Sequence, residues 1–380
     1  MRKKLVFFGG TFDPPHIEHI NMVKAVKKEI NPDKIIIMPT FIPPHKKVFM
    51  TATASDRLKM CELAFGDIGD VEISDWEIRQ KGKSFSCLTV KSLAEKHKGY
   101  DILFLMGTDM ISTFHKWKNP TEILKYSTPL LCVRDGENIS VEESENSFLE
   151  RFGVKIKTLD YIGKNLSSTK IKIKKLLKQD TSNILKDSVD ELIDRLFLYN
   201  DGKRADFLIN NLSKERIVHT EGVMALSIKY AKMLGVNLNK AIKASMYHDV
   251  AKNLDPTNYQ DFKMPKGVPK PVVHQYLGAY VCEKILGITD RQVLNAVKYH
   301  TSGKPKMSKL AKVVYLADML EEGRTYEGVE KTRELSFKDF DKAFILSLDR
   351  SIEHVLERGY SVYPLTLKAR EYYKNLYENS

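Results

Sequence analysis

The sequence predicts two domains of different class, an α/β domain with a parallel sheet in the first half and an all-α domain in the second. Before residue 200, short apolar runs of strand length alternate with amphipathic segments of helical period, as in parallel sheets covered by helices. From residue 203 onward the strand-like runs disappear and helical periodicity continues. Asn200-Asp201-Gly202 is a typical turn sequence between them, so we expect domains at 1–199 and 200–380.

Composition and charge indicate a globular protein with anionic partners. An apolar content of 42% with 29% charged residues is ordinary for a soluble protein, and no apolar stretch reaches the length of a membrane span. The net charge of +12 would suit nucleic acid, but no basic stretch is interleaved with aromatic residues, so we expect small phosphate-bearing substrates instead. The four cysteines lack CxxC spacing and indicate free thiols in a reducing cytoplasm.

The elements of the first half are predicted from apolar runs and capping residues. Strands are expected at 5–8, 35–38, 71–78, 101–106, 130–134 and 154–159. Helices are expected at 20–30, 55–64 and 189–199, and an acidic loop at 135–146. Ligands of open α/β sheets bind at the carboxyl ends of the strands, so the loops that follow strands are the first places to look for function.

The turn after the first strand carries the strongest functional signal. A strand that passes through Gly9 and Gly10 into a helix points main-chain N–H groups and the positive end of the helix dipole at one spot, which suits phosphate. His16 and His19 lie three residues apart and therefore share one face of that helix. An ordinary strand-to-helix turn would also contain glycines, but the paired histidines favour a phosphate site.

The stretch from Gly9 to His19 resembles the signature of the nucleotidyltransferase superfamily, and more closely that of bacterial nicotinate-mononucleotide adenylyltransferases. The resemblance implies a Rossmann-like domain that joins ATP to nicotinate mononucleotide with Mg²⁺, giving deamido-NAD and pyrophosphate in NAD biosynthesis. His16 and His19 would be the catalytic pair that holds the phosphates. Glu18 replaces the usual small residue and is expected to place a carboxylate near the triphosphate.

The same resemblance implies the remaining substrate contacts. Lys46 follows a proline pair and would hold phosphate, Trp117 would pack beside the pyridine ring, and the segment 84–90 would recognise the nicotinate carboxylate. The segment 167–172 resembles a phosphate-gripping S-S-T-x-I-R motif, with lysine in place of arginine. The expected substrate- and nucleotide-binding residues are Gly9, Gly10, Thr11, Phe12, Lys46, Phe85, Ser86, Gly107, Asp109, Trp117, Arg134, Ser167, Ser168, Thr169 and Lys172. Adenylyl transfer to nicotinamide mononucleotide or to another phosphate remains an alternative.

The second half is centred on an adjacent His248-Asp249 pair that we expect on a helix. Further metal-ligand candidates, each expected within its own helical segment, are His219, His274, His300 and Asp318. Imidazole and carboxylate ligands suit Fe, Mn, Co or Zn, and six such side chains could hold two ions. Any one of these histidines alone would be better explained as a core or surface residue, so the interpretation depends on their order along the chain.

That order resembles the H…HD…D pattern of HD-superfamily phosphohydrolases, and residues 203–340 resemble bacterial symmetrical diadenosine-tetraphosphate hydrolases of the HD type. The resemblance implies cleavage to two ADP by metal-activated water, with Fe expected ahead of Mn or Co. Asp249 and Lys252 would be catalytic, and Lys252 and Arg324 would contact phosphate. The helices after residue 340 are expected only to pack, and a homo-oligomer is left open. A nucleotide-sensing module or an RNA-associated protein remain the alternative classes.

Overall fold

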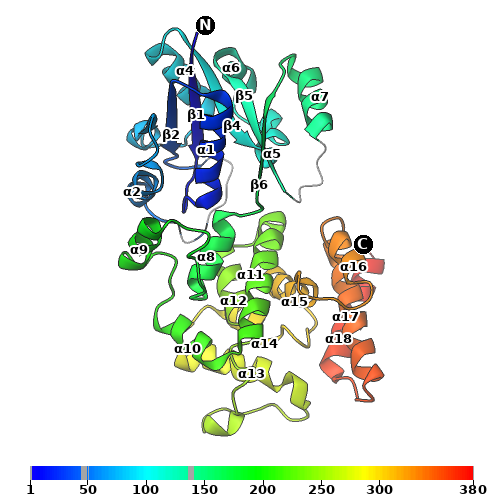
Figure 1. Cartoon of the computed structure of the whole chain (residues 1–380). Helices are drawn as coiled ribbons and strands as arrows, with labels where there is room; N and C mark the ends of the chain where they lie inside the picture. Colours follow the sequence, from blue (N-terminus) through cyan, green and yellow to red (C-terminus); the bar gives the residue numbers. More distant parts are fainter. Residues whose placement is uncertain (1, 44–48, 50, 136–140, 380) are drawn as a thin grey trace. The chain divides into compact units, whose positions relative to one another are not determined.

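The computed structural model describes residues 2–43, 49, 51–135 and 141–379. The chain forms two compact units, which are described separately (Figure 1). The first comprises Met1–Lys46, Met50–Lys175 and Asp180–Tyr199, and the second comprises Lys47–Phe49, Leu176–Gln179 and Asn200–Ser380. Within the described ranges, no helix combines the length and the apolar character that crossing a bilayer requires.

The first unit is built on a six-stranded parallel sheet in the order β3-β2-β1-β4-β5-β6. Its strands are β1 (Lys3–Gly10), β2 (Lys34–Pro39), β3 (Val71–Ile73), β4 (Tyr100–Gly107), β5 (Thr128–Arg134) and β6 (Lys157–Gly163). The order runs outward from β1 to β3 on one side and from β4 to β6 on the other. The chain therefore reverses its winding between β1 and β4, and their carboxyl ends border the crevice where ligands of such sheets bind.

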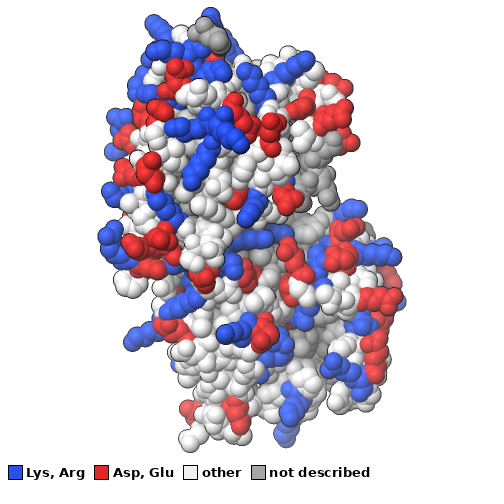
Figure 2. Space-filling view, in the orientation of Figure 1, with Lys and Arg blue, Asp and Glu red and all other residues white. Residues whose placement is uncertain are grey.

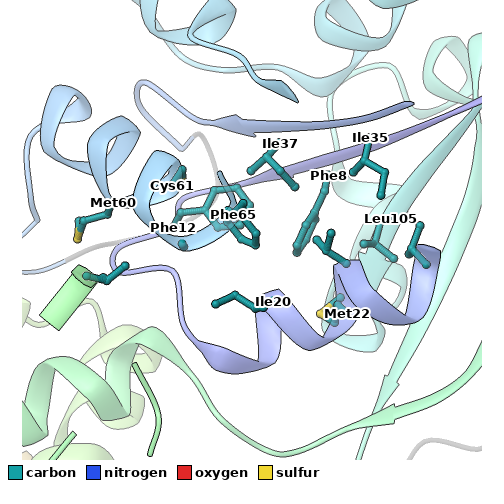
Figure 3. Packing of buried hydrophobic residues seen from close by; sticks show 14 of the residues in the cluster. Phe8, Phe12, Ile20, Met22, Ile35, Ile37, Met60, Cys61, Phe65 and Leu105 are labelled. Atoms are coloured by element: carbon teal, nitrogen blue, oxygen red, sulfur yellow. The ribbon is translucent and has the colours of Figure 1, made fainter. Parts of the chain in front are cut away.

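Helices cover both faces of this sheet, and successive side chains of β1 point alternately to the two faces. Val6 and Phe8 point to one face and pack with α1 (Ile17–Ile30), α2 (Ala54–Phe65) and α9 (Asp187–Arg195). Figure 3 shows this cluster, with Phe8 and Ile37 from the sheet facing Ile20 and Phe65 from the helices. Leu5 and Phe7 point to the opposite face. That face carries α4 (Ser86–Lys96), α5 (Thr108–Ile111), η1 (Phe114–Lys116), α6 (Pro120–Tyr126) and α7 (Val141–Phe152).

Four expectations for the first unit are wrong in detail. The last helix, α9, ends at Arg195 and not at residue 199. The third strand ends at Ile73, because the chain turns into the short helix α3 (Trp76–Arg79). Part of the expected acidic loop is the helix α7, whose Phe148 is buried and packs on Phe114 with ring centroids 5.3 Å apart, while its first turn carries glutamates. The last strand, β6, starts three residues later than expected.

The second unit is helical throughout its described elements, as its periodicity predicts. Its longer helices are α10 (Lys203–Asn211), α11 (Lys214–Leu234), α12 (Leu238–Met246), α13 (Val273–Tyr280), α14 (Arg291–Lys298), α15 (Lys309–Leu320), α16 (Val329–Ser336), α17 (Phe340–Glu357) and α18 (Pro364–Glu378). The helix α15 is buried along most of its length and contacts α11, α12, α14, α16 and α17. Ser213 and Ser308 cap α11 and α15 by accepting a hydrogen bond from the main chain three residues on.

Charge on the visible face is mixed. In Figure 2, Lys and Arg side chains are interspersed with Asp and Glu over the described surface of both units. A nucleic-acid footprint would instead gather basic side chains into one stripe or patch. The positive net charge is therefore spread over this face and does not form a single basic surface on it.

Candidate active sites

A cavity of about 460 Å³ opens beside the carboxyl end of β1. Many of the predicted nucleotide contacts line it, namely Gly9, Gly10, Thr11, Phe85, Ser86, Asp109 and Trp117. Phe7 and Phe104 also contribute to the lining, and their rings lie 4.8 Å apart between centroids. Gly9 has no room for a side chain, because an added Cβ would lie 2.7 Å from the ring of Phe7. The lining thus combines main chain from the glycine turn with aromatic rings.

His16 and His19 lie together at the start of α1. Their rings are stacked, with centroids 3.6 Å apart and 22° between the planes. The main-chain N–H of His16 donates to Nδ1 of His19 at 3.1 Å. This hydrogen bond places the His19 proton on Nε2, which is the donor that a phosphate oxygen needs. The lining of the 460 Å³ cavity does not include either ring, so the histidines extend the site along the loop that follows Thr11.

The loop between the glycines and the histidines is fixed by a buried residue that the sequence analysis missed. Arg57 of α2 is buried and donates to the main-chain oxygens of Thr11 at 2.8 Å and Phe41 at 3.0 Å. Phe12 turns its ring into the core, where it meets Phe8 edge-on at 5.2 Å, so the expected nucleotide contact of Phe12 is restricted to its main chain. The signal in the sequence that could have identified this residue was an arginine on the buried face of α2.

Lys172 does not occupy the predicted phosphate position. Its side chain is only 4% exposed and forms an ion pair with Asp13, whose carboxylate also accepts a hydrogen bond from Tyr199 at 2.6 Å and from the main-chain N–H of Ala52 at 3.1 Å. Burial together with Asp13 raises the pKa of the Tyr199 hydroxyl, which therefore stays a donor. The motif lysine anchors the loop that leads to the histidines, and we correct its expected role accordingly.

We expect the buried Lys172–Asp13 ion pair to stabilise the first unit. Lys172→Met keeps the side-chain volume but leaves Asp13 without its cation, so we expect the unfolding free energy of the first unit to fall by about 3 kcal/mol. Both tryptophans, Trp76 and Trp117, lie in the first unit, so urea unfolding followed by tryptophan fluorescence reports on that unit. The control is Lys170→Met in the same helix, which should cost less than about 0.5 kcal/mol. Equal midpoints for the two variants would contradict the assignment.

The other predicted residues of the second phosphate motif lie at the start of α8 (Ser168–Leu176). Ser168 donates its hydroxyl to the main-chain oxygen of Pro14 at 2.9 Å, and the hydroxyl of Ser167 accepts from the main-chain N–H of Lys170 at 3.3 Å. Thr169 is half-buried beside them. These contacts bring the N-terminal end of α8 against the loop that precedes His16.

Glu18 does not face the expected triphosphate. Its buried carboxylate accepts hydrogen bonds from Tyr161 at 2.8 Å, from the main-chain N–H of Lys164 at 2.9 Å and from Asn21 at 3.0 Å. Burial and the bond to Glu18 raise the pKa of Tyr161 to about 12. Glu18 therefore ties α1 to the end of β6 and is accommodated without placing charge in the nucleotide site.

The last predicted residues of the first site lie at the ends of β4 and β5 or outside the described chain. Gly107 ends β4, and a Cβ there would lie 2.8 Å from the carboxylate of Asp109 and 3.5 Å from the guanidinium of Arg134. Arg134 and Asp109 form an ion pair at 3.9 Å. The predicted phosphate ligand Lys46 lies outside the described residues.

In the second unit, the six predicted metal ligands come together in two adjoining clusters. One contains His219, His248 and Asp318, and the other contains Asp249, His274 and His300. Within each cluster the candidate ligand atoms lie within 4.8 Å of one another. The His248 Nε2 and Asp249 Oδ2 atoms are 3.7 Å apart, which places the two clusters side by side. All six residues are buried or half-buried.

The histidine tautomers suit metal ions. Nδ1 of His248 lies 2.7 Å from the main-chain oxygen of Ser245, and Nδ1 of His300 lies 2.8 Å from that of Val297. Carbonyl oxygens only accept, so each Nδ1 carries the proton and each Nε2 presents its lone pair to the cluster. Burial lowers the pKa of His248 to about 3, which keeps this ring neutral near pH 7.

The carboxylates complete a donor set that fits metal ions. Burial favours the neutral acid at Asp249 and Asp318, but the neighbouring imidazoles outweigh it and hold both carboxyl pKa values well below the usual range. Asp249 Oδ1 is 3.2 Å from His274 Nε2 and 3.4 Å from His300 Nε2, and Asp318 Oδ1 is 2.9 Å from His219 Nε2. Two carboxylates and four imidazoles converging in this way match the ligand preferences of first-row transition metals.

The helical placement expected for these residues is partly wrong. His219, His274 and Asp318 lie in α11, α13 and α15. His248 and Asp249 lie in the turn just beyond α12, and His300 lies just beyond α14. Because His248 and His300 lie beyond the ends of their helices, Nδ1 of each ring can donate to the main-chain oxygen three residues earlier.

Cationic side chains surround the clusters. Arg216 donates to Asp249 at 2.8 Å and Arg324 donates to Asp318 at 2.7 Å. The predicted catalytic Lys252 lies 3.2 Å from His274 Nε2 and 3.8 Å from Asp249. All five of these charged side chains line a cavity of about 770 Å³ together with Thr301 and residues from α17 and α18. An anionic group in this cavity would meet both the clusters and their cations.

Glu321 supports the first cluster and was missed as a functional residue. Its Oε1 lies 3.1 Å from Nδ1 of His219, and Oε2 accepts the main-chain N–H of Gly323 at 2.6 Å. Burial alone would lower the pKa of His219, but its bonds to Asp318 and Glu321 outweigh burial and raise it, so the imidazole is a more basic ligand. The carboxylate also explains Gly222, where an added Cβ would lie 2.4 Å from Glu321 Oε2.

We expect Glu321→Gln to weaken metal binding by about 10- to 100-fold, since carboxylates behind metal-binding histidines typically contribute that much. The measurement is a metal titration of the full chain after chelation. Glu322→Gln is the matched control, because Glu322 is exposed and pairs only weakly with Lys229 at 3.4 Å. A Glu321→Gln protein with the metal affinity of the control would show that Glu321 has no positioning role.

Comparison with known proteins matches the two units to two families. Residues 7–174 match the cytidylyltransferase-like family model and residues 216–323 match the HD domain model. A probable nicotinate-nucleotide adenylyltransferase/Ap4A hydrolase of Mycoplasma genitalium is 28% identical over 92% of this chain and 97% of its own length.

Single-activity relatives match each half separately. A probable nicotinate-nucleotide adenylyltransferase of Aquifex aeolicus is 40% identical over 36% of this chain and 82% of its own length. A symmetrical bis(5'-nucleosyl)-tetraphosphatase of Halalkalibacterium halodurans is 35% identical over 44% of this chain and 94% of its own length. The chain therefore belongs to the nicotinate-nucleotide adenylyltransferase family through its first half and to the HD-domain symmetrical bis(5'-nucleosyl)-tetraphosphatase family through its second.

Proposed function

We propose that the chain is a bifunctional enzyme with domains at 1–199 and 200–380. The first domain transfers the adenylyl group of ATP to nicotinate mononucleotide. A phosphate oxygen of the mononucleotide attacks the α-phosphorus of ATP, the bond from that phosphorus to the bridging oxygen breaks, and pyrophosphate leaves with deamido-NAD as the other product. The observation that carries this proposal is the glycine turn, which joins an aromatic cavity to a stacked histidine pair.

No residue of the first site has to become covalent, so catalysis is positioning and charge stabilisation. Nε2–H of His19 would donate to the phosphate chain, and His16 would hold the His19 ring through the stack and the 3.1 Å hydrogen bond. Mg²⁺, when bound with ATP, would neutralise the leaving pyrophosphate. Arg57 and the Lys172–Asp13 pair would keep the loop in place.

Nicotinate is favoured over nicotinamide by the cations of the cavity. Lys116 and Lys118 line it, and Lys118 Nζ lies 4.3 Å from the centroid of the Phe85 ring. A carboxylate on a pyridine that packs by Phe85 and Trp117 would gain from these charges, whereas an uncharged amide would not. Side-by-side turnover of the two mononucleotides tests this. A higher kcat/KM for nicotinate mononucleotide is expected, and a preference for the amide would select the alternative acceptor.

The second domain, we propose, cleaves diadenosine tetraphosphate symmetrically. A water oxygen bonds to one central phosphorus, the bond from that phosphorus to the oxygen bridging the two central phosphates breaks, and two ADP molecules result. Metal ions held by His219, His248 and Asp318 and by Asp249, His274 and His300 would lower the pKa of the water and neutralise phosphate charge. Lys252 and Arg324 line the same cavity and would contact the phosphoryl oxygens.

The metal is proposed to be Fe, as the family resemblance implies, with Mn or Co as substitutes, since four imidazoles and two carboxylates suit all three ions. Chelation and reloading test the assignment, because the two activities should respond differently. Hydrolysis of diadenosine tetraphosphate should be lost after chelation and return with Fe²⁺, Mn²⁺ or Co²⁺. Adenylyl transfer should need only Mg²⁺. Hydrolysis that survives thorough chelation would rule out the metal-dependent mechanism and leave the nucleotide-sensing role as the alternative.

A reducing compartment is consistent with the thiols. Cys61, Cys87, Cys132 and Cys282 are buried and free. Burial raises the pKa of Cys132 to about 11, so this thiol is protonated and unreactive near pH 7. We therefore propose that the enzyme works in the cytoplasm, where its nucleotide substrates are found.

A further inference from the structure

The turn between the two C-terminal helices forms one wall of the hydrolase cavity. The sequence predicts only packing for these helices, yet the lining of the 770 Å³ cavity runs from Asp249 and Asp318 at the clusters to His354 in α17 and to Arg358 and Tyr360 at the turn. The HD family model ends at residue 323, so this wall comes from a later part of the chain. A cavity of this volume lies within the range typical of small-molecule sites.

The wall has a defined backbone. Arg358 ends α17, and the main-chain N–H of Tyr360 donates to the oxygen of Val355 at 3.1 Å while Gly359 adopts a positive φ of 73°. This pattern is a helix-terminating turn of the Schellman type. The hydroxyls of Tyr363 and Tyr276 are 3.1 Å apart and connect the turn to α13, the helix that carries His274. The turn is therefore held against the helix that supplies a metal ligand.

Two side chains of this wall have groups suited to a ligand and no partner among the residues that the structure describes. Tyr360 is 64% exposed, and within the described chain its ring contacts no other aromatic ring and its hydroxyl forms no hydrogen bond. The guanidinium of Arg358 likewise has no ion-pair partner among the residues that the structure describes. By contrast, Arg216 and Arg324 are already paired with the cluster carboxylates.

The cations of the cavity fall into two groups, one next to the metal clusters and one at the turn, where Arg358 lies. Symmetrical cleavage places the two central phosphates at the metal clusters, next to Arg216, Lys252 and Arg324. Each outer half of the substrate must then extend away from the clusters and needs a cation for its outer phosphate and a flat surface for its base. We propose that Arg358 pairs with an outer phosphate and that the ring of Tyr360 stacks on one adenine. This inference rests on the proposed hydrolase function.

The test is the kinetics of the metal-loaded full chain with diadenosine tetraphosphate. Base–aromatic stacking is sensitive to removal of the ring, so Tyr360→Ala should raise KM by about 5- to 150-fold with little change in kcat or metal content. Tyr360→Phe keeps the ring and should restore the wild-type KM. Leu356→Ala is the matched control, because Leu356 is 59% exposed on the same helix and does not line the cavity.

Inorganic tetraphosphate, used as a competitive inhibitor, distinguishes the roles of the two side chains because it has the four-phosphate chain of the substrate and no base. Its inhibition constant should be unchanged in Tyr360→Ala and raised at least about fivefold in Arg358→Ala, since a charge-assisted pair is lost. A Tyr360→Ala protein with the KM of the control, or a Tyr360→Phe protein as impaired as Tyr360→Ala, would overturn the subsite. A wild-type chain that does not cleave diadenosine tetraphosphate would instead overturn the proposed function.

Discussion

His19→Ala should lower the kcat of adenylyl transfer by at least about 10²- to 10³-fold, the usual loss when a donor to transition-state charge is removed. The ring of His19 is fixed by its stack on His16 and by the hydrogen bond to Nδ1, so its Nε2–H is directed before substrate arrives. A preorganised donor of this kind acts on the charge that develops in the transition state. The measurement is pyrophosphate release from ATP and nicotinate mononucleotide at saturating substrate.

The control for this variant is His115→Ala. His115 lies in η1 on the same unit, is exposed and does not line the cavity, so its removal should leave kcat within about twofold of wild type. Hydrolysis of diadenosine tetraphosphate should be unchanged in both variants and serves as a check on the second unit, while the tryptophan fluorescence of Trp76 and Trp117 checks the folding of the first. If His19→Ala turns over within a few-fold of wild type, the histidine pair is not the catalytic group.

Asp249→Ala should abolish hydrolysis of diadenosine tetraphosphate and lower the bound metal. Asp249 is the sole carboxylate of its cluster, with Oδ1 facing His274 and His300 and Oδ2 facing Arg216. Its removal takes away both a ligand and the charge that offsets the surrounding cations. The loss of metal affinity should therefore exceed the about 10- to 100-fold typical of residues behind the ligands. Metal content by elemental analysis and ADP formation are the measurements.

Two controls distinguish loss of the metal site from misfolding of the chain. Adenylyl transfer by the first unit should persist in the Asp249→Ala protein, which shows that the first unit is intact. Asp261→Ala removes an exposed carboxylate of the same unit and should leave metal content and hydrolysis at wild-type levels. An Asp249→Ala protein that keeps its metal and its hydrolase activity would remove the metal-dependent mechanism.

Much of the architecture could be predicted because burial is encoded in spacing. The apolar runs of β1, β2, β4 and β5 are buried on both faces of the sheet, so they stand out as continuous apolar segments. The glycine turn and the histidine pair follow directly from local sequence, since residues three apart on a helix share a face. The gathering of the six cluster residues was predicted from their order along the chain, and the structure brings all six together.

The errors concern contacts between distant parts of the chain. Lys172 and Glu18 belong to phosphate-binding motifs by position, yet one pairs with Asp13 and the other bonds to residues at the end of β6. Periodicity shows which face of a helix is buried, but it does not show which charges meet there. The hairpin of α17 and α18 was assigned to packing for the same reason, since the spacing of its residues does not show that one side of it lines a cavity.

Product identification on the wild-type protein is the decisive test of whether one chain carries out two separate phosphorus chemistries. The metal-loaded chain is given ATP with nicotinate mononucleotide in one reaction and diadenosine tetraphosphate in another, and the products are resolved by chromatography and mass spectrometry. The account predicts deamido-NAD with pyrophosphate in the first and ADP as the sole nucleotide product in the second. Formation of ATP with AMP from the dinucleotide, or no product in either reaction, would contradict it.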